Sequence, residues 1–205
     1  MNPSRFVRFV VALWMAAGAV QAQTTAAPQP SAVAPVSDMA LGSPKAKVTV
    51  VEYASVGCPH CAVWARTVFP QFKKAQIDTG RVRFVFREML TGDSALAAAG
   101  FLTARCAGPK KYFQVVDAVF AQQEQIEHGG AAVLAVIAKD AGLNDKQLEA
   151  CLADEAALKA LTERTTKDAK DHGVTGTPTF LVQGRKLEGD QSLAQLQAAI
   201  AAVPR

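Results

Sequence analysis

Apolar residues change their spacing along the chain, and each spacing predicts a different kind of element. From residue 48 to 54 the chain reads Val-Thr-Val-Val-Glu-Tyr-Ala, a nearly continuous apolar run that is typical of a central strand covered on both faces. Residues 81–87 alternate polar and apolar side chains, which predicts a second strand. The segment 59–77 between them has helical spacing, and Pro70 is expected to kink that helix. Two strands joined by a helix predict a βαβ unit with a parallel strand pair.

Helical spacing then persists for some 80 residues, from about Asp93 to His172. Five helices are expected there, separated by glycine, proline and capping residues. Their predicted ranges are 94–107, 110–123, 131–141, 145–153 and 155–171. The segment therefore predicts a helical insertion within an α/β domain.

Strand character returns at residues 173–182. The turn Gln183-Gly184 and the short run 185–187 follow, which predicts an antiparallel hairpin. Ser192 is the expected cap of a last helix over residues 193–202.

The beginning of the chain has the composition of a secretory signal peptide. Within residues 1–22, Arg5 and Arg8 give a positive start, an apolar stretch follows at 9–20, and a small-residue cleavage site ends at Ala22. The apolar stretch is shorter than the roughly 20 residues that span a bilayer. We therefore expect cleavage, with an uncleaved anchor as the alternative, and a mature protein that does not itself span the membrane.

Residues 23–40 are rich in Ala, Pro, Gln, Thr and Ser and are expected to form a flexible leader without a core. The remainder suits one domain. Removing residues 1–22 takes away two arginines and no acids, so the formal net charge falls from +4 to +2, with 20 basic residues facing 18 acidic ones. A charge so close to neutral argues against a nucleic-acid partner.

Candidate chemistry is concentrated where the first strand meets its helix, at Cys58-Pro59-His60-Cys61. Cys58 occupies the N-cap position, and Pro59 suits the first helical position because its missing N–H needs no partner there. A thiolate at Cys58 would accept hydrogen bonds from the amides of His60 or Cys61 and would feel the positive end of the helix dipole. The dipole supplies about one pKa unit, so direct N–H···S bonds and an imidazolium at His60 must supply any larger shift.

Two cysteines at this spacing can form and break a small disulfide. We interpret Cys58 as the attacking sulfur and Cys61, one turn further into the helix, as the resolving one. Stabilising the Cys58 thiolate stabilises the reduced form, which makes the disulfide a better oxidant. The alternatives are a structural disulfide or half of a zinc site, which normally needs a second pair of ligands. The other candidate ligands are isolated in the sequence: Cys106, Cys151, His128 and His172. We therefore expect no metal and no cofactor beyond the redox-active disulfide.

Cys106 and Cys151 lie in the predicted helical insertion. If Cys58 pairs with Cys61, these two are left to pair with each other and close a loop of about 45 residues, which stabilises the fold by up to ~4 kcal/mol. In an exported protein we favour this structural disulfide over two free buried thiols.

Glu52 interrupts the first strand, six residues before Cys58. Acidic residues are rarely buried without a reason. Glu52 is either a semi-buried carboxylate that accepts or relays the proton of the resolving thiol, or an acid near a strand edge with its head in water.

The Cys-Pro-His-Cys sequence after a strand, the helical insertion, and Gly176-Thr177-Pro178-Thr179-Phe180 before a terminal hairpin and helix together resemble the DsbA family of thioredoxin-fold oxidoreductases. The likeness runs from about Leu41 to the C-terminus, and Glu52 matches the family's semi-buried glutamate. It implies an α/β thioredoxin fold with an inserted helical domain. The implied thioredoxin-like domain is 41–92 with 173–205, and the implied insertion is 93–172.

The resemblance also implies roles for two residues outside the cysteine motif. Pro178 would be cis and would pack against the disulfide. The backbone of Thr177 would then be free to pair with a substrate strand. Threonine at this position departs from the valine typical of the best-known DsbA oxidases and is common in other branches, including disulfide isomerases.

The function implied is a periplasmic oxidase that donates the Cys58–Cys61 disulfide to unfolded or reduced exported proteins and is reoxidised by a membrane partner of the DsbB type. A disulfide isomerase or reductase of the same fold is the first alternative. A copper- or metal-binding thioredoxin-like protein, using Cys58, Cys61 and His60, is the second. A non-catalytic binding protein that retains the fold is the third.

Overall fold

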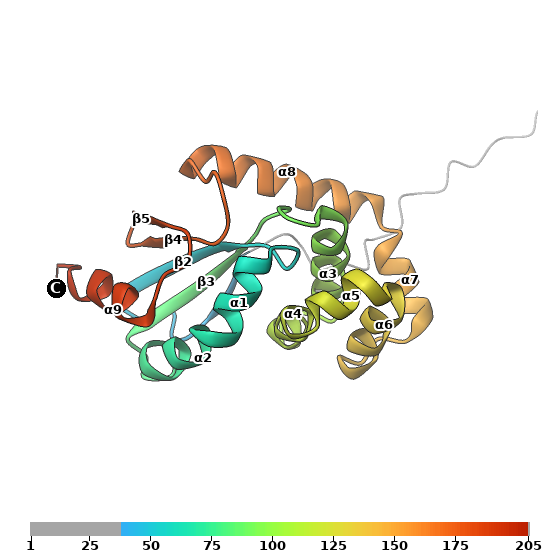
Figure 1. Cartoon of the computed structure of the whole chain (residues 1–205), viewed down its shortest axis with the longest axis horizontal. Coiled ribbons are helices and arrows are strands. Elements are labelled where there is room, and N and C mark those ends of the chain that lie inside the picture. Colours follow the sequence, from blue (N-terminus) through green and yellow to red (C-terminus); the bar gives the residue numbers. More distant parts are fainter. Residues whose placement is uncertain (1–37, 205) are drawn as a thin grey trace, which may run out of the picture. The chain divides into compact units, whose positions relative to one another are not determined.

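The computed structural model describes residues 38–204 (Figure 1). The expected signal peptide at 1–22, and most of the expected leader, lie outside the described residues. Five strands form one sheet in the order β1-β3-β2-β4-β5 within the described range. Their bounds are β1 Met39–Leu41, β2 Val48–Ala54, β3 Val82–Glu88, β4 Thr179–Val182 and β5 Arg185–Glu188.

The directions of the strands confirm the predicted βαβ unit and hairpin. The central pair β2 and β3 is parallel, whereas β4 runs antiparallel to β2 and β5 antiparallel to β4. In this register Glu52 lies opposite Phe86 on one side and Phe180 on the other. Glu52 is thus in the middle of the sheet and not at its edge.

Strand β1 corrects the expected extent of the leader at residues 23–40. Met39 and Ala40 pair antiparallel with Phe86 and Val85 of β3, and the Met39 side chain is only 7% exposed. The pairing satisfies the outer edge of β3. A strand of three residues beside an Ala-rich stretch is too short to show an alternating pattern in the sequence.

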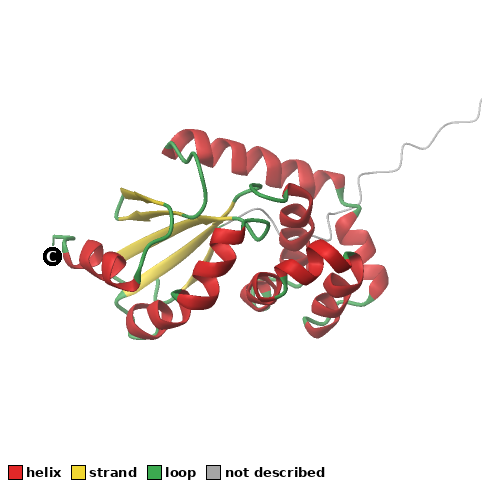
Figure 2. Ribbon diagram, in the orientation of Figure 1, coloured by secondary structure: helices red, strands yellow, loops and turns green. Residues whose placement is uncertain are grey.

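Helices cover both faces of the sheet, as Figure 2 shows. On one face α1 (Pro59–Thr67), α2 (Phe69–Phe72) and α9 (Leu193–Ala201) pack in the main core, where Trp64 contacts the ring of Phe180. On the other face α8 (Glu155–His172) places Ala169 in a smaller apolar cluster that includes Tyr53 and Leu181. Ser192 caps α9 as expected.

The expected helix over 59–77 is interrupted two residues earlier than predicted. Helix α1 ends at Thr67, and Pro70 lies in the first turn of α2, where a missing N–H needs no partner. A π-helical turn, η1 (Lys73–Ile77), completes the segment.

The helical insertion contains one more helix than we predicted. Its first five helices are α3 (Ser94–Cys106), α4 (Tyr112–Ala121), α5 (Gln123–Gly129), α6 (Ala131–Asp140) and α7 (Asp145–Leu152), and α8 follows. The sequence predicts a helix over 110–123 and then a break at Gly129-Gly130. It predicts no separate helix α5 between them. The chain turns at Gln122, whose backbone leaves helical geometry with φ −117° and ψ 19°.

A buried ion cluster joins β3 to the insertion. Arg105 of α3 donates two hydrogen bonds to the Glu88 carboxylate, at 2.8 and 2.7 Å. The Tyr112 hydroxyl donates a third at 2.8 Å, and Arg164 of α8 donates a fourth at 3.0 Å. Glu88 and Arg105 are each 1% exposed. Four donors around one carboxylate compensate for its burial.

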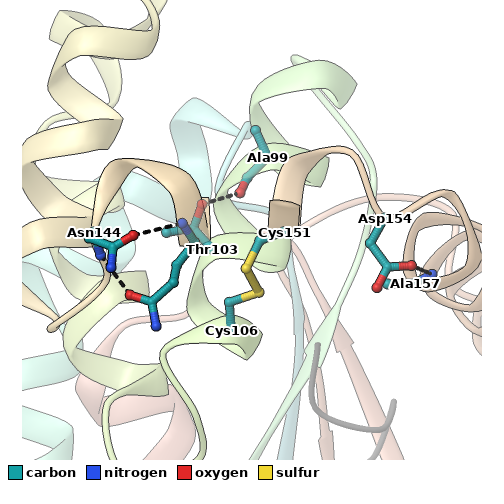
Figure 3. Close-up of a disulfide and its surroundings, with 8 residues drawn as sticks. Ala99, Thr103, Cys106, Asn144, Cys151, Asp154 and Ala157 are labelled. Carbon is teal, nitrogen blue, oxygen red and sulfur yellow. Dashed lines mark hydrogen bonds between the residues drawn. A yellow bond between two sulfur atoms is a disulfide. The ribbon is translucent and has the colours of Figure 1, made fainter. Parts of the chain in front are cut away.

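A disulfide joins Cys106, at the end of α3, to Cys151 in α7 (Figure 3). The two cysteines are 45 residues apart in the sequence. The side chains of Asn144 and Asp154 cap the starts of α7 and α8 on either side of it. The disulfide therefore links α3 covalently to α7 within the insertion.

Candidate functional site

The segment that carries Cys58 is clamped by the loop that follows β3. Ser55 Oγ accepts a hydrogen bond from the Gly57 amide at 3.1 Å and donates one to the Thr91 carbonyl at 2.7 Å. The Asp93 amide donates to the Gly57 carbonyl at 2.9 Å. A Cβ at Gly57 would lie 2.0 Å from the Asp93 carbonyl oxygen, so this close approach requires glycine.

Cys58 and Cys61 lie one turn apart at the start of α1. Cys58 is the N-cap with φ −101° and ψ 120°, and Pro59 follows at the first helical position. Cys58 is 7% exposed and Cys61 is fully buried. The Cys58 thiol donates a hydrogen bond to the Thr177 carbonyl at 3.4 Å.

The two sulfurs have opposite acidities. A hydrogen bond from the Cys61 thiol lowers the pKa of Cys58 to about 5, against the opposing effect of burial, and the Thr177 side chain and the amides of Cys61 and His60 lower it further. The bond that Cys61 donates, together with its burial, raises the pKa of Cys61. Cys58 is therefore the thiolate of the reduced pair, and Cys61 keeps its proton.

The helix start contributes less directly than the sequence suggested. The Cys58 side chain makes no capping hydrogen bond of full strength to the first turn of α1, although the amides of Cys61 and His60 still lower its pKa. The principal donor to the Cys58 sulfur is the Cys61 thiol, a role that the sequence does not predict.

The imidazole of His60 is directed to Asp190, in the loop after β5. His60 Nδ1 lies 3.1 Å from Asp190 Oδ2, and 72% of the His60 side chain is exposed. The effect of His60 on the pKa of Cys58 is that of its backbone amide. The His60 ring therefore lies on the protein surface near the cysteine pair and is exposed to solvent.

Glu52 is 3% exposed and lines a small pocket, together with buried Trp64 and exposed Asp117. Burial raises the pKa of the Glu52 carboxyl well above its usual range, and the charges of Asp117 and Cys58 raise it further. The charge of Glu52 in turn raises the pKa of Cys61. The Glu52 carboxyl therefore keeps its proton to higher pH than an exposed glutamate, and it lies close enough to Cys61 to change the pKa of that thiol.

The Thr177–Pro178 peptide is cis. Pro178 is buried, and its carbonyl accepts a hydrogen bond from the Gly189 amide at 2.9 Å. Thr177 meets the reactive sulfur through its carbonyl and meets Thr91 through its hydroxyl, with 2.6 Å between the two oxygens. The loop before β4 thus closes over the Cys58 side of the site.

Sequence reasoning missed three residues that complete the surroundings of the site. Gln123 of α5 donates a hydrogen bond from Nε2 to the Val56 carbonyl at 2.7 Å, Asp117 of α4 lines the Glu52 pocket, and Thr91 contacts Thr177. Each reaches the site from a segment distant in the sequence. None carries a local motif that could have identified it.

The range 38–204 contains no group of three or more His, Cys, Asp or Glu side chains placed to hold a metal ion. In that same range, none of the helices combines the length and the apolar composition needed to cross a bilayer.

Comparison with known proteins places this architecture in a family. A family model described as Thioredoxin matches residues 35–202. A Rickettsia bellii protein, provisionally named a protein-disulfide oxidoreductase, is 33% identical over 167 residues, or 80% of this chain and 63% of that protein. Disulfide bond formation protein D of Bacillus subtilis is 26% identical over 165 residues, or 78% and 74% of the two chains.

Solved structures share the fold. The crystal structure of Wolbachia pipientis alpha-DsbA1 has a TM-score of 0.74 at 24% identity and covers 82% of this chain and 92% of that one. Oxidised BdbD from Bacillus subtilis has a TM-score of 0.71 at 22% identity, covering 83% and 96%. The chain belongs to the thioredoxin family, and its fold is that of the solved alpha-DsbA1 structure. It spans less than two thirds of the length of the Rickettsia bellii relative.

Proposed function

We propose that this chain is a protein thiol–disulfide oxidoreductase whose Cys58–Cys61 pair exchanges a disulfide with cysteines of other proteins. The observation that carries the proposal is the opposite acidity of two thiols one helical turn apart. The pKa of Cys58 is lowered to about 5, and that of Cys61 is raised. Cys58 is thereby prepared to be attacked and to leave as a thiolate, and Cys61 to take up a proton when the disulfide opens.

The exchange begins with the oxidised protein and a substrate that carries two reduced cysteines. A substrate thiolate attacks Cys58 Sγ, the Cys58–Cys61 bond breaks, and Cys61 leaves and takes up a proton. Glu52, protonated because it is buried, supplies or relays that proton. The second substrate thiolate then attacks the substrate sulfur that is bonded to Cys58. The substrate disulfide forms, the bond to Cys58 breaks, and Cys58 leaves as a thiolate. The substrate loses two electrons and two protons. The cysteine pair gains the two electrons and, at Cys61, one proton, and the other proton goes to the solvent.

The direction of exchange favours an oxidase. A leaving thiol of low pKa leaves faster, and a stabilised thiolate stabilises the reduced enzyme over its disulfide. The substrates in this proposal are unfolded or reduced proteins exported to the periplasm, which pair with the backbone of Thr177 beside cis Pro178. A membrane protein of the DsbB type restores the disulfide, and residues 1–22 direct the export.

Thr177 also favours a second candidate, a disulfide isomerase or reductase of the same fold, because threonine before the cis proline is common in those branches. The two differ in the resting state of the pair. Trapping free thiols with an alkylating reagent in intact cells distinguishes them: an oxidase holds Cys58 and Cys61 mainly as a disulfide, and an isomerase or reductase holds them as thiols.

Oxidation of a reduced two-cysteine peptide by the oxidised protein tests the proposal. Cys58→Ser should abolish the reaction, and so should Cys61→Ser, because neither variant can form the Cys58–Cys61 disulfide that the substrate attacks. The Cys106→Ala/Cys151→Ala variant retains the reactive pair and serves as the control. Peptide oxidation by Cys58→Ser at the wild-type rate would end the proposal.

A further inference from the structure

The hydroxyls of Thr91 and Thr177 form a pair beside Cys58 that the exchange reaction described above does not use. Their oxygens are 2.6 Å apart, so one of them donates a hydrogen bond to the other. Thr91 lies in the loop between β3 and α3, and Thr177 precedes the cis proline. The direction of this hydrogen bond decides whether the Thr177 proton is available to the sulfur.

The charge of Cys58 determines that direction. The protonated sulfur donates to the Thr177 carbonyl at 3.4 Å. The thiolate has no proton to donate, and the Thr177 side chain is then among the groups that stabilise it. Because a hydrogen bond to an ionised acceptor is stronger than one between two neutral hydroxyls, the Thr177 proton is directed to the thiolate. The oxygen of Thr177 then accepts from Thr91.

Thr91 is held in place by the clamp on the Cys58 segment. Its carbonyl accepts a hydrogen bond from Ser55 Oγ at 2.7 Å, and its neighbour Gly92 fits so closely that a Cβ there would lie 2.0 Å from the Gly57 carbonyl oxygen. The backbone that carries Thr91 is therefore fixed relative to the backbone that carries Cys58.

We propose that Thr91 is a positioning residue for the reactive sulfur, donating its hydroxyl proton to Thr177 Oγ1 and so holding the Thr177 hydroxyl toward the Cys58 thiolate. The disulfide form carries no charge at Cys58, so this relay favours the reduced form and makes the disulfide a stronger oxidant. The inference rests on the proposed redox function and adds a residue that tunes it.

Two substitutions distinguish the effect of the Thr91 hydroxyl from the effect of the size and shape of its side chain. Thr91→Val keeps nearly the same volume without a hydroxyl, whereas Thr91→Ser keeps the hydroxyl. We expect Thr91→Val to raise the midpoint of Cys58 thiolate formation, followed by ultraviolet absorbance against pH, by roughly half a unit, with Thr91→Ser restoring the wild-type midpoint. Thr67→Val is the matched control, because Thr67 is exposed and its hydroxyl donates to the Val63 carbonyl of its own helix, away from Cys58.

Thermal unfolding of the reduced and disulfide forms distinguishes an effect of Thr91 on the Cys58 thiolate from a general contribution of Thr91 to the stability of the fold. Loss of the relay should lower the stability of reduced Thr91→Val more than that of its disulfide form. An equal loss in both states with an unchanged midpoint would make Thr91 a structural brace and overturn the proposal. A lowered midpoint of Cys58 thiolate formation would mean that Thr177 donates to Thr91, and it would also overturn the proposal. Activity in Cys58→Ser would instead reject the redox function itself, whatever Thr91 does.

Discussion

At the scale of single residues, a proton shared between two sulfurs determines which of them reacts. The Cys61 thiol donates to the Cys58 sulfur, and this bond lowers the pKa of one and raises that of the other. Both effects arise from the same contact, so a substitution at either cysteine changes the acidity of the other. The helix dipole and the amides of α1 add to this asymmetry.

The first prediction concerns the pH dependence of the reduced protein. The folded pKa of Cys58 is about 5, well below the unfolded value near 9, so the thiolate stabilises the fold above the unfolded pKa and this contribution is lost as the pH falls through 5. At pH 7 it should amount to about 3 kcal/mol. Denaturant unfolding of the reduced and disulfide forms at pH 4 and pH 7 measures it. If the difference in unfolding free energy between the reduced and disulfide forms is the same at pH 4 and pH 7, Cys58 is not the stabilised thiolate.

Glu52 gives a second prediction at this scale. The folded pKa of its carboxyl is raised, so protonated Glu52 is compatible with the fold below the unfolded pKa and the fold loses stability as the pH rises through the folded pKa. Glu52→Gln cannot ionise and should be more stable than the wild type at high pH. It should also oxidise peptide about 100-fold more slowly, the lower end of what a positioned acid contributes. Single-turnover kinetics of peptide oxidation measure this difference. A Glu52→Gln rate equal to the wild-type rate would exclude Glu52 from the proton transfer.

At the scale of elements, the Glu88 cluster connects the sheet to the insertion that surrounds the site. Arg105→Met removes two of the four hydrogen bonds to a buried carboxylate and half of its compensating charge. We expect a loss of about 3 kcal/mol in the free energy of unfolding. The control is Lys73→Met, which breaks an exposed pair with Asp78 at 2.7 Å and should cost less than about 1 kcal/mol. Equal losses in the two variants would show that the cluster is no more stabilising than a surface pair.

The elements that the sequence predicted correctly are those whose pattern is local. The alternation at 81–87 and the turn at Gln183-Gly184 identify β3 and the terminal hairpin without reference to the rest of the chain. Strand β1 and helix α5 have no such pattern. The pairing of Met39 with β3 and the bond from Gln123 to Val56 exist only after the chain has folded.

The same distinction holds for the site. Cys58 and Cys61 are identifiable because the chemistry needs them three residues apart at a strand–helix junction. Asp117 and Thr91 reach the site through packing, and threonine or aspartate at one position carries no signal of that contact. The buried position of Glu52 could be suspected from the apolar run around it, although not the pocket that it shares with Asp117.

At the scale of the whole molecule, the two cysteine pairs affect stability in opposite ways. Reducing Cys58–Cys61 produces a stabilised thiolate and opens only a very small loop. Reducing Cys106–Cys151 releases a loop of 45 residues and creates no such anion, and chain entropy puts its cost at about 4 kcal/mol. The first reduction should therefore stabilise the protein at neutral pH, and the second should destabilise it.

A titration with a redox buffer tests this contrast in one experiment. As the buffer becomes more reducing, the denaturant midpoint should first rise, as Cys58–Cys61 opens, and then fall as Cys106–Cys151 opens. The Cys106→Ala/Cys151→Ala variant should show only the rise, from a starting stability lower by about 4 kcal/mol. Its Cys58 should titrate as in the wild type, because the groups that set the acidity of Cys58 are Cys61, Thr177 and the first turn of α1. A fall at the first step would mean that the reactive disulfide stabilises the fold, and the chain would then be a poor oxidant.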